Sequence, residues 1–403
     1  MKRQKKKILV LDTGKEWGGG TVSLLELLKR LDPARYEVTA LFYTNYSKGS
    51  GSDIRRELEA IDVEFIHLEI RKRFLAKAIK EVGRGALWAL PSMRKKFITF
   101  YDYTERIEPA GKAIASILKE GQFDMLYMNN QPSSNMEGML AAGIAGTLCI
   151  QHSRVEVELT RAEAAEVNRV VDRVICVSKG VMNSLIKAGV LAKRCCLVHN
   201  GIDPSVKAAR PAQEVRDALG VKKDEFLIGT VGSLIKRKRV GILLETIALL
   251  RKKGIEVKGL IAGAGPEEEA LKERAAGLGI AEQVTFTGFS ADALSYIRAM
   301  DIFMLTSIKE GLPRVILEAM LMERPVVAAR VTGPAELVIN DVTGFLVEGA
   351  GAEDFARQVK RLLSSPELRT AMGQKGKRRV VKDFSIESYV EGVLTVFKEV
   401  FNS

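Results

Sequence analysis

The stretch KKILVLDTGKEWGGGTVSLLELLKRL, residues 6–31, begins with a short apolar run, passes through three glycines and ends in an amphipathic pattern. This order predicts a buried strand, a glycine-rich turn at 18–20 and a helix over 21–31. The plan returns in EFLIGTVGSLIKRKRVGILLETIALL, residues 225–250, where Val240, Leu243 and Ile247 recur at helical spacing. The chain therefore contains two copies of a strand–turn–helix unit.

Further units of this kind follow at GTLCIQHSR, RVICVSKGVMNSLIKAG, VKGLIAGAGPEEEALKERA and PVVAARVTGPAELV. Short apolar runs that alternate with helical patterns indicate parallel sheets covered on both faces. We therefore predict an α/β protein with two Rossmann-like, doubly wound parallel-sheet domains at 1–200 and 201–385. The boundary falls where Gly, Pro and charge cluster, at 197–211. Ligands of such sheets bind beyond the carboxyl ends of the strands, so two facing domains place the site in the cleft between them.

The composition is that of a globular protein, with 403 residues of which 46% are hydrophobic. The four cysteines form no C-x-x-C pair, which favours a reducing compartment. The apolar run ILVL after the basic start is shorter than the core of a signal peptide, and no stretch reaches the roughly 18 apolar residues of a membrane span. We therefore expect a cytoplasmic protein.

Positive charge is concentrated in the first half of the chain. The net charge is +12, and residues 71–96 hold nine Lys/Arg against one acidic residue, with Phe, Leu, Ile, Val and Trp between them. This composition is typical of a helix on an anionic membrane surface, and a solvated helix or loop is the alternative. No nucleic acid partner is expected, because the recognised binding signatures are missing from the sequence. The residues predicted to meet the membrane are Arg71, Lys72, Arg73, Trp88, Lys95 and Lys96.

Both strand-to-helix turns carry groups suited to an anion. Consecutive glycines at 18–20 let a ligand approach the backbone near a helix N-terminus, although a purely structural turn explains them as well. Their spacing is neither G-x-G-x-x-G nor a P-loop, so it does not favour a dinucleotide or ATP. The second turn carries Lys236, Arg237, Lys238 and Arg239, and four cations suit a diphosphate.

The stretch KEGLPRVILEAMLMERP, residues 309–325, holds two carboxylates in apolar surroundings. Pro313 suits the first position of a helix, which leaves Glu310 in the preceding loop. Glu318 then lies on a helix expected to be buried, where an unpaired carboxylate is costly. Its partner is either the vicinal hydroxyls of a ribose or an Arg or Lys elsewhere in the chain, and the residues leave both open.

Six motifs in order resemble the GT-B fold retaining glycosyltransferases of family GT4, the glycosyl transferases group 1 that include bacterial lipopolysaccharide and mannosyl transferases. They are LVHNGID, GSLIKRKRVGILLE, GAGPEEEAL, VTFTGF, EGLPRVILEAM and GPAELV…TGFLV. The resemblance covers nearly the whole chain. It implies transfer of a hexose-type sugar from a UDP-, GDP- or ADP-linked donor with retained configuration. It also implies that 386–403 forms a helix crossing back onto the first domain.

The resemblance gives roles to particular residues. It implies that Glu318 accepts the ribose hydroxyls, that Glu310 meets the sugar and that Lys238 binds the diphosphate. Ser233 stands where the family has an Arg, and Arg237 or Arg239 are the candidates to replace that cation. The residues expected to bind the donor are Gly19, Gly20, Ser233, Arg237, Lys238, Gly263, Phe289, Gly311, Leu312, Pro313 and Glu318.

The resemblance also implies a mechanism without a metal or cofactor. His152 follows a predicted strand where the family places a cleft histidine, whereas a lone His is more often structural. The expected catalytic residues are Glu310, His152 and Lys238. The chain has no D-x-D and no evident nucleophile, so the family's front-face attack by the acceptor hydroxyl is expected.

The expected acceptor is a lipid-linked or lipopolysaccharide-type oligosaccharide at the inner leaflet, with the protein peripheral on that membrane. Asn129, Asn130 and Arg154 are the candidates for acceptor contact. Two alternatives remain, a nucleotide-sugar epimerase or hydrolase of the same fold and an inactive sugar-nucleotide-binding partner subunit. Fold alone does not decide among them.

Overall fold

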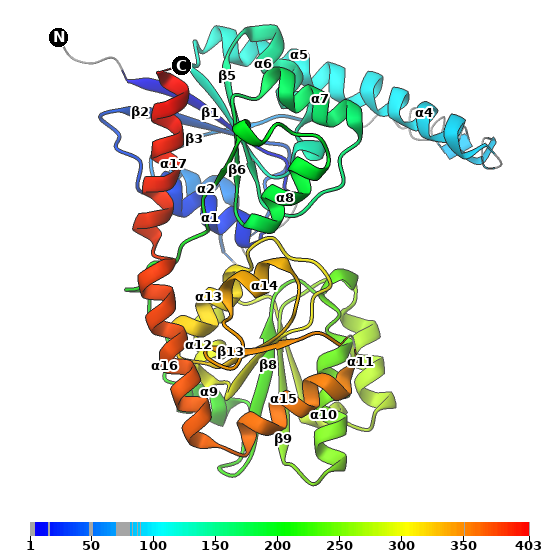
Figure 1. Cartoon of the computed structure of the whole chain (residues 1–403), viewed down its shortest axis with the longest axis vertical. Helices are drawn as coiled ribbons and strands as arrows, with labels where there is room; N and C mark the ends of the chain where they lie inside the picture. Colours follow the sequence, from blue (N-terminus) through cyan, green and yellow to red (C-terminus); the bar gives the residue numbers. More distant parts are fainter. Residues whose placement is uncertain are drawn as a thin grey trace.

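The computed structural model describes residues 5–14, 17–47, 51–69, 81–82, 84–86, 88, 90–349 and 351–402. Two α/β lobes lie one above the other in Figure 1, and each is built on one parallel sheet. The predicted fold class, two Rossmann-like parallel-sheet domains, is therefore confirmed.

The first lobe contains a seven-stranded sheet in the order β3-β2-β1-β4-β5-β6-β7. Its strands are β1 (Lys6–Asp12), β2 (Tyr36–Phe42), β3 (Glu64–His67), β4 (Met125–Asn129), β5 (Leu148–Ser153), β6 (Arg173–Cys176) and β7 (Cys195–Leu197). The order reverses between β1 and β4, so the crevice beyond these two strands is the position favoured for a ligand. Asp12, Asn129 and His152 lie side by side there, because the register pairs Asp12 with Asn129 and Asn129 with His152.

The second lobe contains a six-stranded sheet in the order β10-β9-β8-β11-β12-β13. Its strands are β8 (Phe226–Val231), β9 (Val257–Ala262), β10 (Val284–Gly288), β11 (Ile302–Leu305), β12 (Val326–Ala329) and β13 (Gly344–Val347). Here the order reverses between β8 and β11. The loops that follow these two strands carry Lys238 and Glu310, so the topology brings both residues to one switch point.

Helices cover both sheets. In the first lobe they are α1 (Gly19–Leu28), α2 (Ile54–Glu59), α4 (Pro91–Asp102), α5 (Glu108–Glu120), α6 (Met136–Ala145), α7 (Arg161–Val170) and α8 (Lys179–Lys187). In the second they are α9 (Ala212–Ala218), α10 (Gly241–Lys252), α11 (Glu268–Gly277), α12 (Ala293–Ala299), α13 (Arg314–Leu321), α14 (Thr332–Leu337), α15 (Ala352–Leu363) and α16 (Pro366–Asp383). In α10, the apolar face predicted from Val240, Leu243 and Ile247 is buried.

The bounds predicted for the first helix were wrong. Gly18 is the N-cap of α1, so Gly19 and Gly20 form its first turn rather than a preceding loop. Glycine costs a helix most in its interior, and composition alone does not separate a turn from the first turn of a helix. The helix ends at Leu28, before Pro33.

The chain crosses between the lobes twice, and the two crossings are hydrogen-bonded to each other. Ile202 N–H donates to the carbonyl of Phe384 at 3.0 Å, and Ile386 N–H donates to the carbonyl of Ile202 at 3.0 Å. The last helix, α17 (Ile386–Phe401), then runs up beside the first lobe, in red in Figure 1. Its Tyr389 and Phe397 are buried in the core that contains β1 and α1.

A helical arm, defined here as residues 91–107, projects away from the first lobe (Figure 1). It consists of α4 and a π-helical turn, and Arg106 in that turn anchors it to α6. One guanidinium nitrogen of Arg106 lies 3.0 Å from each carboxylate oxygen of the fully buried Glu137. The apolar side chains exposed on the arm and just before it are Val82, Trp88, Leu90, Met93, Phe100 and Tyr103.

Candidate functional site

A buried carboxylate and two cations meet at the switch point of the second sheet. Glu310 is 6% exposed, and Lys238 Nζ lies 2.7 Å from its Oε1 while Arg237 Nη1 lies 3.2 Å from its Oε2. Burial opposes ionisation of Glu310, but the two cations outweigh burial and lower its pKa below 4.5. The three residues therefore form a charged cluster with an excess of positive charge, which suits an anionic ligand.

Glu318 has a protein partner four residues earlier on α13. Arg314 Nε donates to Glu318 Oε1 at 3.1 Å, and Arg314 Nη1 donates to the carbonyl of Gly201 at 2.9 Å. The helix is largely buried, as predicted, and the Glu318 side chain is 19% exposed. Pro313 is the N-cap of α13, so the helix begins at Arg314, one residue after the predicted start. Arg314 could have been predicted as the partner of Glu318 from their i,i+4 spacing, which places the two side chains on one helix face.

Two of the predicted donor-binding glycines, Gly19 and Gly311, lie where the lobes touch, and Gly20 is next to Gly19. A Cβ on Gly19 would lie 3.6 Å from Cβ of Arg314, and a Cβ on Gly20 would lie 3.8 Å from Cγ of Arg154. Gly311 packs more tightly, since a Cβ there would lie 1.9 Å from the carbonyl oxygen of Arg154. The segment 310–313 of the second lobe therefore rests directly on the backbone of the first.

Three further donor-binding predictions lie just after β8, β9 and β10. Gly263 has φ +156°, and a Cβ there would lie 1.9 Å from the carbonyl oxygen of Gly232, so only glycine allows the two loops to pack. Ser233 follows Gly232 and is half-buried, and Phe289 is 41% exposed beside Gly288. These positions do not test the donor roles, which stay predictions.

His152 is fully buried at the carboxyl end of β5. Its Nδ1 is hydrogen-bonded to the hydroxyl of Tyr127, while within the described part of the chain Nε2 has no hydrogen-bond partner. Burial and then the charge of Arg154 lower its pKa well below 6.5, so the imidazole is neutral near pH 7. The unpaired Nε2 of this neutral ring can form one hydrogen bond with a ligand. The catalytic role of His152 stays a prediction.

Two of the three residues predicted to contact the acceptor belong to a buried polar network. Arg154 Nε donates to Asn129 Oδ1 at 2.9 Å, and its terminal nitrogens donate to Asn200 Oδ1 at 2.8 Å and to the Tyr389 hydroxyl at 3.2 Å. Asn129 is itself fully buried and donates to Asp12 at 2.6 Å. Only Asn130 is partly exposed. The acceptor role stays a prediction, and Asn130 is the member of the set best placed to meet a ligand.

The sequence did not single out Asp12 or Asn200. Asp12 accepts hydrogen bonds from Asn129, Asn130 and the backbone N–H of Gly14, and burial raises its pKa in spite of them. A charged residue at the carboxyl end of a buried parallel strand was the available signal for Asp12. For Asn200 the available signal was its position in the motif LVHNGID, but both its partners are distant in the sequence.

A second contact between the lobes centres on Glu336 of α14. Its carboxylate accepts from the backbone N–H groups of Lys179 at 2.9 Å and Gly180 at 3.0 Å, the first two residues of α8. His199 Nε2 lies 3.3 Å from the same carboxylate. No role was predicted for His199 from the sequence, and this hydrogen bond joins residues that are 137 apart in the chain. A carboxylate at a helix N-terminus is favoured by the helix dipole, and here it joins the two lobes.

The predicted membrane residues are only partly described. Trp88 is 74% exposed, and Lys95 and Lys96 belong to α4. Arg71, Lys72 and Arg73 lie outside the described residues. Among the described residues, no helix is both long enough and apolar enough to cross a membrane, and no group of three His, Cys, Asp or Glu side chains is arranged to hold a metal.

The comparisons with known proteins agree with the two-lobed fold. The family described as Glycosyltransferase Family 4 matches residues 17–206, and the family described as Glycosyl transferases group 1 matches residues 211–379. The chain is 31% identical to the capsular polysaccharide biosynthesis glycosyltransferase CapM of Staphylococcus aureus, over 40% of this chain and 43% of CapM. It is 30% identical to the lipopolysaccharide core biosynthesis glycosyltransferase LpsE of Rhizobium meliloti, over 44% of this chain and 52% of LpsE.

The matched region spans about half the length of these curated relatives. Among solved structures, Alr3699/HepE of Anabaena in complex with UDP and glucose is 21% identical, with a TM-score of 0.79 over 98% of this chain and 100% of that one. That likeness concerns the fold, and the two family matches lie one on each lobe. The chain therefore belongs to the GT-B fold glycosyltransferases of family GT4, the glycosyl transferases group 1.

Proposed function

We propose that this chain is a retaining glycosyltransferase that moves a hexose-type sugar from a nucleotide-sugar donor to a lipid-linked or polysaccharide acceptor at the inner membrane face. The observation that carries the proposal is the buried Glu310 held between Lys238 and Arg237 at the switch point of the second sheet. Such a cluster offers cations to a diphosphate and a carboxylate to sugar hydroxyls. Relatives named for capsule and lipopolysaccharide synthesis support the acceptor class.

In this proposal the charged cluster changes partners when the donor binds. The diphosphate takes the place of Glu310 beside Lys238 and Arg237, and the freed carboxylate accepts hydroxyls of the sugar. Arg237 supplies the second cation that Ser233 cannot. The cations then stabilise the negative charge that develops on the leaving diphosphate, in a site that the first lobe closes against water. No bound metal is required, and activity should survive a chelator.

The chemical step proposed is front-face attack. The acceptor hydroxyl oxygen bonds to the anomeric carbon on the side from which the diphosphate oxygen departs, and the hydroxyl proton passes to that departing oxygen. The carbon becomes oxocarbenium-like between these events. Cations and backbone N–H groups that meet the diphosphate only as it gains charge lower the barrier more than uniform binding does.

Membrane association of the helical arm is the second part of the proposal. The arm and the residues before it expose Trp88, Leu90, Met93 and Phe100 in a basic segment. The arm itself projects from the lobe (Figure 1). Tryptophan and leucine beside basic residues suit the interface of an anionic leaflet. Trp88→Ser should weaken sedimentation with anionic vesicles and leave neutral vesicles unaffected. Equal binding of wild type and variant would contradict this part alone.

Calorimetric titration of UDP, GDP and ADP tests the donor site. One nucleotide should bind wild type, and Glu318→Gln should weaken it by about 1.5–3 kcal/mol, as for a lost charged hydrogen bond. Arg314→Gln is the matched control, because it breaks the same ion pair and leaves the carboxylate available to a ribose. If both variants bind like wild type, Glu318 serves only the ion pair. If wild type binds none of the three nucleotides, the proposal fails.

Product analysis distinguishes the two alternatives. An epimerase or hydrolase would convert the donor alone at its full rate, and an inactive partner subunit would bind a nucleotide but convert nothing. Transfer that depends on an acceptor supports the proposal. The anomeric configuration of the product, read by NMR, decides whether configuration is retained.

A further inference from the structure

Asn200 joins the two lobes through both ends of one buried amide. Its side chain is 6% exposed; Oδ1 accepts from Arg154 at 2.8 Å, and Nδ2 donates to the backbone carbonyl of Leu312 at 3.1 Å. A guanidinium only donates and a carbonyl only accepts, so these two partners fix which way the amide lies. Both bonds are lost if the amide turns over, because the NH2 group would then face a donor and the oxygen would face an acceptor.

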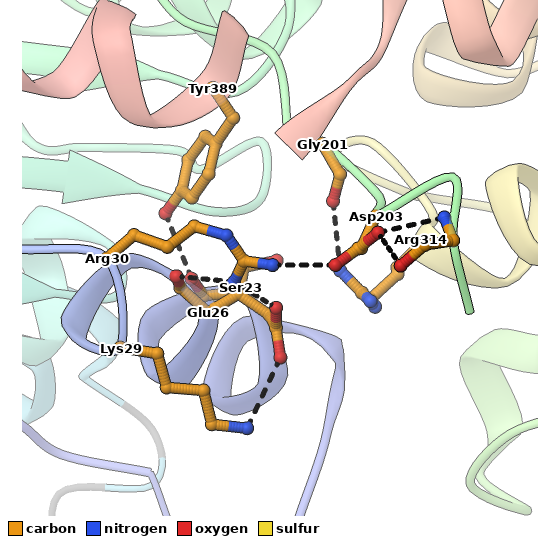
Figure 2. Close-up of polar contacts among 9 residues, drawn as sticks. Ser23, Glu26, Lys29, Arg30, Gly201, Asp203, Arg314 and Tyr389 are labelled. Carbon is orange, nitrogen blue, oxygen red and sulfur yellow. Dashed lines mark hydrogen bonds and ion pairs between the residues drawn. The ribbon is translucent and has the colours of Figure 1, made fainter. Parts of the chain in front are cut away.

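On one side, Asn200 terminates a chain of buried polar contacts in the first lobe. Arg154, 8% exposed, is held by Asn129, which is in turn held by Asp12 at the switch point of the first sheet. The Tyr389 hydroxyl also accepts from Arg154 and donates to the carbonyl of Ser23 in α1, the second of these contacts being drawn in Figure 2. A buried cation with these partners has a single well-defined position, because moving it leaves polar groups unpaired.

On the other side, Asn200 reaches the segment 310–313 that begins with Glu310. This segment is buried throughout, and its Gly311 packs on the backbone of Arg154. Leu312 has its carbonyl bonded by Asn200, two residues from the carboxylate proposed to meet the sugar. The first lobe therefore holds the second lobe's segment by one backbone contact and one side-chain hydrogen bond.

The position of Asn200 ties both contacts to the crossing between lobes. The next residue, Gly201, accepts from Arg314 at 2.9 Å, and Asp203 pairs with Arg30 of the first lobe at 2.8 Å, both drawn in Figure 2. A Cβ on Gly201 would lie 2.4 Å from the carbonyl oxygen of Ser385 in the second crossing. Rotation of one lobe against the other thus displaces Asn200 from Arg154, from Leu312 or from both.

We propose that Asn200 is a positioning residue that places the segment 310–313 for sugar transfer only while the lobes are closed. The proposal rests on the proposed function. It separates two properties of the site. The diphosphate binds to Lys238 and Arg237 of the second lobe and does not need Asn200, whereas the transferred sugar is aligned through it. Loss of the Leu312 contact therefore lowers the rate of transfer more than it lowers nucleotide affinity.

Two substitutions distinguish the hydrogen bond to Arg154 from the hydrogen bond to Leu312. Asn200→Asp keeps an acceptor for Arg154 but removes the donor to Leu312, and Asn200→Ala removes both. Asn183→Asp is the control, because Asn183 is exposed on α8 and undergoes the same change of charge. Each variant is measured for thermal midpoint, for Kd of the nucleoside diphosphate that binds wild type, for kcat and KM with donor and acceptor, and for donor hydrolysis per transfer.

We expect Asn200→Asp to bind the nucleotide within threefold of wild type, to lose at least tenfold in kcat and to hydrolyse a larger share of the donor. Asn200→Ala should lose at least as much in kcat, and Asn183→Asp should match wild type. Wild-type kcat in Asn200→Asp overturns the proposal, as does a parallel loss of nucleotide affinity, kcat and thermal midpoint, which indicates general damage. A wild-type protein that transfers no sugar overturns the proposed function itself, which is a distinct result.

Discussion

Gly311→Ala is the sharpest test of contact between the lobes. The added methyl carbon would lie 1.9 Å from the carbonyl oxygen of Arg154, 2.9 Å from its carbonyl carbon and 3.2 Å from Cα of Val155. All three atoms are backbone, so no side chain can turn aside. Ordinary contact for a Cβ begins at 3.4 Å, so the segment 310–313 must retreat from the first lobe by about 1.5 Å. Overpacking of this kind typically costs about 1–3 kcal/mol.

That cost falls on the closed arrangement of the lobes. By the relation of 1.4 kcal/mol to a factor of ten, kcat/KM for donor and acceptor should fall about 5- to 150-fold. Steady-state kinetics gives this value, and small-angle X-ray scattering should show a larger radius of gyration in the variant. Gly277→Ala is the matched control, since Gly277 is exposed at the end of α11 with no atom within 4 Å of its Cβ position. Unchanged kcat/KM and unchanged scattering in Gly311→Ala would refute the reasoning.

Three further outcomes are expected. Because burial and Arg154 lower the pKa of His152 below 6.5, its imidazole should show no titration by NMR between about pH 6 and 8; a titration near 6.5 would contradict the buried, neutral ring. Burial opposes ionisation of Glu336, but hydrogen bonds from His199 and the α8 amides lower its pKa below 4.5. Its stabilisation is therefore present above pH 4.5 and lost as pH falls through the folded-state pKa. Glu336→Gln should lower the thermal midpoint at pH 7, with the difference from wild type shrinking below pH 4.5; a difference independent of pH would count against this contact. Lys238→Met should lower kcat by roughly 10²–10³-fold as a lost charge-stabilising group. The double variant Lys238→Met/Glu310→Gln should have a higher thermal midpoint than Lys238→Met alone, but an equally low kcat. Recovery of kcat in the double variant would show that Lys238 only neutralises Glu310.

Much of the fold could be predicted from the sequence, because hydrophobic periodicity depends only on residues close together in the chain. The apolar run before Asp12 and the helical spacing of Val240, Leu243 and Ile247 predicted two strand–turn–helix units, and both are present. Parallel sheets and a site at their carboxyl ends follow from that alternation. The predicted bounds of α1 were wrong. Its start was misplaced because a glycine pattern does not separate a turn from the first turn of a helix.

Only part of the candidate site could be predicted from the sequence. Glu310, Lys238 and Arg237 stood out as charges beside apolar strands, and the structure brings these three into one cluster. Arg314 was also within reach, since four residues separate it from Glu318 on one helix. Arg154 was predicted to contact an acceptor, and that role stays a prediction. The structure shows in addition that its guanidinium is hydrogen-bonded to the buried Asn129 and Asn200, which the sequence did not indicate.

The sequence by itself determined the two parallel sheets, the order of their units and the residues at their carboxyl ends, because those depend on neighbours along the chain. Only the tertiary structure decided which of these residues meet. Asn200 lies 46 residues from Arg154 and 112 from Leu312, and Glu336 lies 156 residues from Gly180. The pairs Asn200–Leu312 and Glu336–Gly180 form only where the two lobes meet, whereas Asn200 and Arg154 meet within the first lobe. No local pattern records that geometry, because it depends on how the two crossings orient the lobes.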